Sequence, residues 1–233
     1  MSGRYAELLV LQDRTEIVSC NVCGSEESRI LFPDSSLSPE GKHGIARCSV
    51  CGLVYRTTRM TQRAMNEHYR SRHYDDPSDD WVVGRSSVYL PYLHLLAQSR
   101  RSNRILDIGA GPGFFLNTCK QRGWECFGIE LADECRGFAW NNFGIRLADV
   151  PLEATDFGDN SFDVVTFWNV LDQLCDPRGV LTEACRILRP GGLVIVRSPN
   201  STFHVGMRRV AGLLSRLFDW DGMNLHVVFH LYS

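Results

Sequence analysis

The sequence of 233 residues predicts a doubly wound α/β fold preceded by a small metal-binding module. Two observations lead to this prediction. Apolar segments typical of buried strands alternate with helix-like segments over residues 104–200, and a glycine-rich turn follows the first strand. In addition, two C-x-x-C-G motifs lie within residues 20–52, ahead of the predicted sheet.

The glycine-rich turn lies in the segment 104–116, which reads RILDIGAGPGFFL. Gly109, Gly111 and Gly113 have no side chain, so the backbone can approach a ligand closely. The helix that follows offers free N–H groups to a carboxylate or phosphate. Such a turn is typical of a nucleotide site at the carboxyl edge of a parallel sheet, although it also occurs in unrelated α/β proteins. Phe114 occupies a position where the dinucleotide fingerprint needs a small residue, which argues against a nicotinamide or flavin cofactor.

The stretch DIGAGPGFF at 107–115 resembles motif I of the class I S-adenosylmethionine-dependent methyltransferases. This resemblance implies a Rossmann-like sheet and a loop that holds the amino-acid end of S-adenosylmethionine. The residues that it assigns to cofactor binding here are Asp107, Gly109, Ala110, Gly111 and Gly113.

Two acidic residues after the glycine turn complete the expected cofactor site. Glu130 ends a predicted strand at 124–130, roughly twenty residues past the turn, where a carboxylate can bind two ribose hydroxyls. The alternative for Glu130 is an ordinary exposed acid at a strand end. A short third strand is predicted at 144–149, and the resemblance implies that Asp149 holds the adenine amino group. The neighbouring Leu131 and Val150 are included in the predicted site.

The segment 156–168, DFGDNSFDVVTFW, resembles the loop and fourth strand of the same family. Trp168 and Asn169 then lie at the carboxyl end of this strand, next to the expected methyl group, and core packing explains Trp168 equally well. A helix is predicted from Asp176, which precedes a proline at the first helical position. The R-P-G-G motif should end this helix, so the fifth strand is predicted over 193–200.

The catalytic base is unknown from the sequence. Small-molecule members of the family often carry Glu-His after the fourth strand, whereas Gln173 stands in place of the histidine here. Asp172 is a candidate, with an acid at a helix start as the alternative. His204, His226 and His230 follow later, and each alone is more typical of a surface histidine.

The four cysteines of the C-x-x-C-G motifs are predicted to bind one structural zinc ion. They are Cys20, Cys23, Cys48 and Cys51. Four thiolates complete a tetrahedral shell and leave no position open for catalysis. Iron–sulfur ligation and disulfides are the alternatives. The chain has nine cysteines, an odd number, and no secretory signal, which argues against disulfides and favours a cytoplasmic setting.

We expect three parts: a zinc-knuckle module at 1–58, a helical lid or linker at 59–99, and a cofactor-binding core at 100–233. Helices are predicted at 61–74 and 88–98. Tyr69, Tyr74 and Arg85 could reach the cofactor pocket, and amphipathic surface contact is the alternative for these residues. The chain ends where relatives enter a further helix and two last strands, so it is expected to be truncated or naturally minimal. An open sheet edge would then be covered by another subunit in an oligomer, or the protein would be poorly stable. A basic amphipathic helix is predicted over 203–218.

These patterns predict methyl transfer from S-adenosylmethionine to a small-molecule acceptor, such as a sugar or a biosynthetic intermediate. One alternative is an rRNA or tRNA methyltransferase whose zinc module binds RNA. The formal net charge of −2 does not favour nucleic acid as the main partner. A catalytically weak partner module that binds cofactor and zinc is the other alternative. No apolar run approaches the length of a membrane span.

Overall fold

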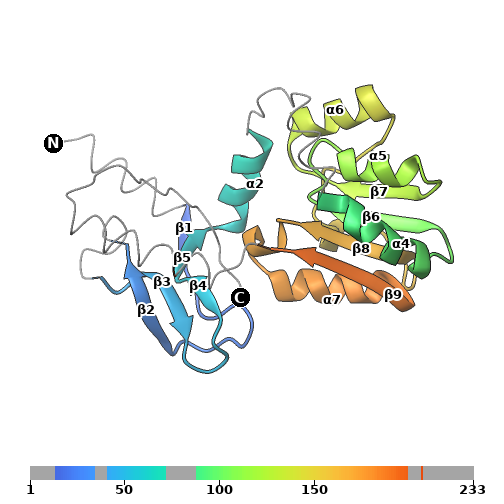
Figure 1. Ribbon diagram of the computed structural model, residues 1–233. Coiled ribbons are helices and arrows are strands. Elements are labelled where there is room, and N and C mark those ends of the chain that lie inside the picture. Colours follow the sequence, from blue (N-terminus) through green and yellow to red (C-terminus); the bar gives the residue numbers. More distant parts are fainter. Residues whose placement is uncertain (1–13, 35–40, 72–87, 199–205, 207–233) are drawn as a thin grey trace. The chain divides into compact units, whose positions relative to one another are not determined.

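The computed structural model describes residues 14–34, 41–71, 88–198 and 206 of the chain (Figure 1). The described residues divide into two compact units. One contains the residues before Gln62 together with Asp172–Cys175, and the other contains Gln62–Leu171 and Asp176–Arg197. Apart from Gly206, the predicted helix at 203–218 lies outside the described residues, as do the three late histidines, Tyr74 and Arg85.

The first unit is built from short antiparallel strands. Its three-stranded sheet has the order β2 (Ser28–Pro33), β3 (Gly44–Cys48), β4 (Val54–Arg56), while β1 (Thr15–Ile17) pairs with β5 (Thr58–Met60). Arg59 donates hydrogen bonds to the Glu16 carboxylate, at 2.8 Å, and to the Cys175 carbonyl oxygen. The segment Asp172–Cys175 is thereby attached to the β1–β5 pair.

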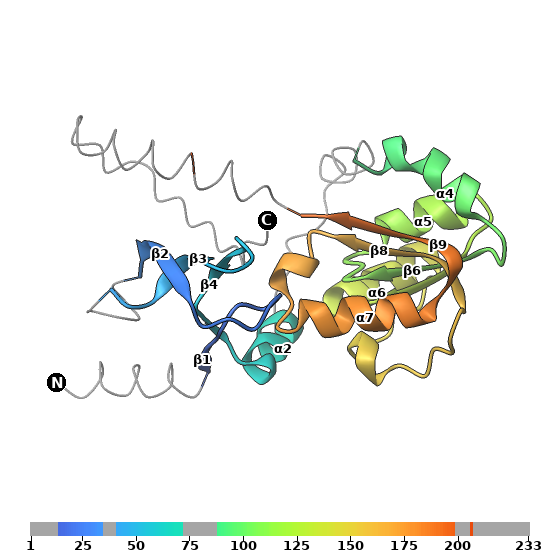
Figure 2. The same ribbon diagram turned by 90° about the horizontal axis from the view of Figure 1, so that it is seen from below.

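The second unit contains a parallel sheet of four described strands, which confirms the predicted fold class. Its order is β7 (Glu125–Ile129), β6 (Arg104–Ile108), β8 (Phe162–Trp168), β9 (Leu188–Arg197). Figure 2 shows α4 and α5 on one face of this sheet and α7 on the opposite face. Because β6 pairs with β7 on one side and β8 on the other, the order of the strands reverses at β6. Ligands of open α/β sheets bind outside the carboxyl ends of the strands at this kind of position.

The helices begin close to the predicted positions. They are α2 (Gln62–Arg70), η1 (Leu90–Tyr92), α4 (Leu93–Ser99), α5 (Phe114–Lys120), α6 (Asp133–Phe143), η2 (Leu152–Ala154), η3 (Leu171–Gln173) and α7 (Pro177–Ile187). The predicted cap of α7 is confirmed, because the Asp176 carboxylate accepts a hydrogen bond of 2.9 Å from the Gly179 N–H. None of the helices described is long and apolar enough to cross a membrane.

The predicted third strand at 144–149 is wrong, because the structure has only one isolated parallel bridge there, between Ile129 and Ala148. Ala148 donates its N–H to the Gly128 carbonyl oxygen and accepts from the Glu130 N–H, at 2.8 and 2.9 Å. Ala148 alone therefore makes both backbone hydrogen bonds to the end of β7, and no strand continues on either side of it.

The predicted start of the fifth strand is also wrong by five residues. β9 begins at Leu188, directly after α7, and it contains the R-P-G-G motif. The pairing with β8 shifts register between Phe162 and Val164. A Cβ at Gly192 would lie 3.0 Å from the Asp163 carbonyl oxygen, so the motif allows the two strands to approach closely.

Large apolar side chains fill the interior of the second unit. Phe115, Phe162 and Phe167 are at most 1% exposed. The edge-to-face contacts of Phe162 with Phe127 and Phe157 have ring centroids 5.3 and 4.9 Å apart. This packing holds the strands rigidly, so the residues at their carboxyl ends are held in fixed positions.

Candidate functional site

The glycine turn after β6, Gly109–Gly113, is attached to the end of β7. The N–H groups of Gly109 and Ala110 both donate to the Ile129 carbonyl oxygen, at 2.8 and 2.9 Å. A Cβ at Gly109 would lie 2.3 Å from the Val170 Cγ2, and the φ of this glycine is +68°. Val170 therefore packs directly against the turn, and only glycine fits at this position.

The turn has one packed side and one open side. A Cβ at Gly113 would lie 3.1 Å from the Ala139 Cβ, so this glycine allows α5 and α6 to pack closely. A Cβ at Gly111 would have no neighbour within 4 Å. Gly111 is half-buried, and the space beside its Cα is free for a ligand.

The Glu130 carboxylate faces the turn, as the predicted cofactor site requires. Its side chain is 7% exposed, and it accepts hydrogen bonds of 2.8 Å from the Gly111 and Ala132 N–H groups. Each carboxylate oxygen has two lone pairs, so capacity for hydroxyl donors remains. Leu131 lies between Glu130 and Ala132 in the sequence.

Asp107 lies inside the sheet on β6 and is 1% exposed. The Thr166 hydroxyl of β8 donates to its Oδ1 at 2.7 Å. Burial raises the pKa of Asp107 to about 8. The carboxyl group is therefore largely protonated at neutral pH, and its hydrogen bond links the two strands directly below the turn.

Asp149 and Val150 follow the bridge at Ala148. The Glu130 N–H bonds to the Ala148 carbonyl oxygen, so the chain reaches Asp149 directly beside the end of β7. Arg70 of α2 donates to the Asp149 carbonyl oxygen at 3.2 Å. The structure thus brings this segment next to Glu130, although it forms no strand.

Trp168 ends β8 inside an aromatic cluster. Its ring centroid lies 5.0, 5.4 and 5.1 Å from those of Tyr89, Tyr92 and Phe115. The Trp168 Nε1 is buried and has no hydrogen-bond partner in the described part of the chain. Trp168 therefore packs in the core and also lies at the carboxyl end of the strand, and its position next to the methyl group stays a prediction. The sequence did not identify Tyr89 and Tyr92 as its neighbours.

Asn169 adopts a left-handed conformation directly after β8, with a φ of +57°. Its N–H donates to the Arg197 carbonyl oxygen at 2.8 Å, and its Oδ1 accepts from the Arg197 Nη1 at 2.8 Å. Arg197 is a site residue that was not predicted from the sequence. The sequence feature that could have identified it is a basic residue near the end of the predicted fifth strand, which pairs with β8.

Asp172 is 1% exposed, and neither of its carboxylate oxygens has a hydrogen-bond partner among the described residues. Burial raises its pKa. It lies in η3, within the segment that belongs to the first unit. The catalytic base is therefore not assigned.

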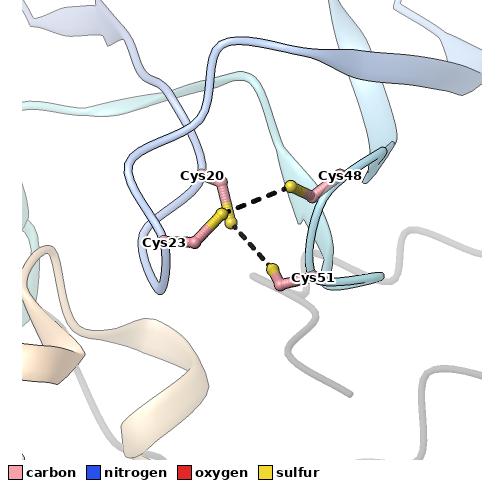
Figure 3. A group of neighbouring side chains, drawn as sticks. All are labelled: Cys20, Cys23, Cys48 and Cys51. Carbon is pink, nitrogen blue, oxygen red and sulfur yellow. Dashed lines mark hydrogen bonds between the residues drawn. The ribbon is translucent and has the colours of Figure 1, made fainter.

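The four cysteines of the two C-x-x-C-G motifs come together in the first unit, as Figure 3 shows. We call them the cysteine cluster: Cys20, Cys23, Cys48 and Cys51. Their Sγ atoms all lie within 4.8 Å of one another, and the pairs Cys20–Cys51 and Cys23–Cys48 are 3.5 Å apart. Four sulfurs around one Zn²⁺ at 2.3 Å would be separated by about 3.8 Å, so the donor set fits a tetrahedral metal.

The backbone of each motif supports this arrangement. The N–H of Gly24 bonds to the Cys20 carbonyl oxygen and that of Gly52 to the Cys48 carbonyl oxygen, at 2.8 and 3.1 Å. Both glycines have a positive φ, +73° and +80°, which closes the turn. A hydrogen bond from the Cys51 N–H lowers the pKa of Cys48, whereas burial raises the pKa of Cys20. The lowered pKa of Cys48 favours the thiolate that a metal requires at that position.

Comparison with known proteins gives one family match, the family described as "Methyltransferase domain", over residues 84–230. Two similar curated proteins are Ubiquinone biosynthesis O-methyltransferases. The one from Azoarcus sp. (strain BH72) is 27% identical over 139 residues, which are 57% of this chain and 54% of that protein. The one from Aeromonas salmonicida (strain A449) is 32% identical over 127 residues, which are 52% and 49%. The chain thus spans about half the length of these relatives.

Two solved structures match part of this chain. The YcgJ protein from Bacillus subtilis has a TM-score of 0.43 at 27% identity, and the match covers 47% of this chain and 50% of that one. The PH0226 protein from Pyrococcus horikoshii OT3 has a TM-score of 0.49 at 20% identity, covering 64% and 69%.

Proposed function

This chain belongs to the family of methyltransferase domains, and we propose that it transfers a methyl group from S-adenosylmethionine to a small-molecule acceptor. One observation supports this function above all others: the Glu130 carboxylate faces the open backbone at Gly111, with 2.8 Å between its oxygen and the Gly111 nitrogen. A glycine turn and a carboxylate in this arrangement can bind the two ends of an adenosyl amino acid.

The residues of the turn would hold the amino-acid part of the cofactor, and Glu130 would accept hydrogen bonds from its ribose hydroxyls. Leu131, Asp149 and Val150 would line the adenine, because Ala148 is bonded to the end of β7. Asp107 is buried below the turn, so its proposed contribution is to support the turn from inside the sheet.

Bound S-adenosylmethionine supplies a methyl carbon that is already activated by a sulfonium. The chain then has to position the acceptor in line with this carbon and to exclude water, which can lower a barrier by roughly 7–11 kcal/mol. Trp168 and Asn169, at the carboxyl end of β8, would border the acceptor. A base is needed only where the acceptor must lose its proton early.

The cysteine cluster would hold a structural zinc ion. All four donors are thiolates, so the ion would stabilise the first unit and would not take part in the reaction. The size of the unit agrees with this role, because its buried core is small and includes two of the ligands, Cys20 and Cys48.

The proposed function is tested by calorimetric titration with S-adenosylhomocysteine. We expect the wild-type chain to bind it, and Glu130→Gln to weaken binding by about ten-fold or more, since a charged acceptor of two hydroxyl groups is lost. Glu125→Gln is the matched control, because this exposed acid lies at the opposite end of the same strand. Absence of binding to the folded wild-type protein would refute the proposal.

A further inference from the structure

Arg197 lies at the carboxyl end of the sheet, beside the residues proposed to border the acceptor. In the parallel pairing of β8 and β9, Arg197 is the partner of Trp168. Its side chain turns toward the end of β8, since Nη1 donates to the Asn169 Oδ1 at 2.8 Å. The residue is exposed, so the guanidinium is accessible to a ligand.

The charge of this guanidinium is not compensated within the described residues. Arg186 pairs with Asp159 and Glu183, and Arg189 pairs with Asp163. By contrast, Arg197 has only a neutral amide as its side-chain partner in the described chain. A guanidinium has five N–H donors, and a carboxylate can accept two of them side by side.

The position of Arg197 is linked to the glycine turn through two consecutive residues. Asn169 bonds to Arg197 through both its backbone and its side chain. The next residue, Val170, is in contact with Gly109. A ligand held at the turn would therefore end close to the guanidinium.

We propose that Arg197, oriented by Asn169, binds a carboxylate at the carboxyl end of β8. This inference rests on the proposed function. The carboxylate belongs either to the methionine part of the donor or to the acceptor, and both sources present the same chemistry to the guanidinium. Asn169 is a positioning residue in this site, since it fixes the guanidinium through its amide oxygen.

The first arm of the test asks whether the donor supplies the carboxylate. Wild type and Arg197→Gln are titrated with S-adenosylhomocysteine and with 5′-methylthioadenosine, which lacks the amino-acid part. If the donor is the source, the variant binds S-adenosylhomocysteine about ten-fold or more weakly and binds 5′-methylthioadenosine unchanged. Arg197→Lys should recover part of the affinity, because it keeps the charge but not the planar fork.

The second arm asks whether the acceptor supplies the carboxylate. Protein saturated with S-adenosylhomocysteine is titrated with benzoate and with benzamide, which are aromatic probes suited to the neighbourhood of Trp168. If the acceptor is the source, wild type prefers benzoate, and Arg197→Gln loses this preference.

Arg122→Gln is the matched control for both arms. Arg122 is an exposed arginine in the turn that precedes β7, at the opposite edge of the sheet, and it donates to the Thr118 carbonyl oxygen. Removing its charge should change neither titration. The inference is overturned if S-adenosylhomocysteine binds Arg197→Gln as tightly as wild type and the variant leaves the benzoate preference unchanged. Failure of the wild type to bind S-adenosylhomocysteine would instead refute the proposed function.

Discussion

The two units of this protein are stabilised in different ways. In the first unit, one described core cluster consists of Cys20, Ala46, Cys48, Leu53 and Tyr55, so two of its five members are cysteines of the cluster. In the second unit, Phe115, Phe162 and Phe167 are almost completely buried. Small folds bury too little apolar surface to be stable alone, and a bound metal can supply the missing free energy. If the cysteine cluster holds a metal as proposed, one chain combines a metal-dependent unit with one stabilised by packing.

Loss of the metal should have the largest effect and should break only the first unit. Cys48→Ser or chelation is expected to unfold β2–β4, because structural zinc contributes roughly 10–16 kcal/mol of apparent binding free energy in small domains. Hydrogen exchange should show lost protection at 44–48 and unchanged protection at 105–108. Cys185→Ser, at an exposed cysteine of α7, is the control. Full protection of 44–48 in metal-free protein would show that the unit is stable through packing alone.

Deleting a core aromatic ring should destabilise the second unit in turn. Phe162→Ala removes a fully buried ring that contacts Phe127 and Phe157, and the cavity should cost about 3–5 kcal/mol. Chemical denaturation measures this loss. The metal content of the variant should stay equal to that of wild type. A change below about 1 kcal/mol would mean that the core rearranges to fill the cavity.

The buried Asp107 should make the second unit sensitive to pH. Its pKa is about 8 in the folded chain against 3.8 as the ordinary value, so between these values the folded state holds more protons than the unfolded state. Its contribution to stability is complete below pH 3.8 and is lost as the pH rises through about 8. The effect should reach a few kcal/mol, since one pKa unit corresponds to about 1.4 kcal/mol.

Thermal unfolding of wild type and Asp107→Asn between about pH 5 and 8 tests this expectation. Wild type should lose stability relative to the variant as the pH rises. A constant difference across the range would exclude Asp107 as the cause. The pKa of the other buried aspartate of the sheet, Asp163, lies below this pH range. Although burial would raise its pKa, hydrogen bonds from the Arg101 N–H and the Arg189 guanidinium lower it.

The smallest effect should come from the glycine turn, where Gly109 and Gly111 differ in the space available for a side chain. Gly109→Ala places a methyl group against Val170 and should cost about 1–3 kcal/mol in stability. Gly111→Ala meets no atom within 4 Å, so only the strain of its positive φ remains. Denaturation should rank Gly109→Ala as the less stable variant. Gly111→Ala should mainly weaken S-adenosylhomocysteine binding, and equal stability of the two variants would contradict the packing of Val170.

Most of the site could be predicted because its signals are local. The turn, the spacing to Glu130 and the two C-x-x-C-G motifs are each encoded within a few residues, and backbone geometry follows from glycine at these positions. The predicted strand at 144–149 failed because its one bridge, between Ala148 and Ile129, is a tertiary contact that its own apolar pattern does not determine. The early start of β9 was overlooked for a similar reason, since the close approach to Asp163 is a tertiary contact.

The sequence by itself determined the fold class, the glycine turn with its acidic partner, and the four cysteines. Local conformational preferences and fixed residue spacing suffice for these features. Only the tertiary structure decided which side chains from separate strands meet. It brought Arg197 to Asn169, packed Tyr89 on Trp168, and attached Cys175 to Arg59. These pairings depend on strand order and register, which arise from packing across the whole sheet and not from any short segment.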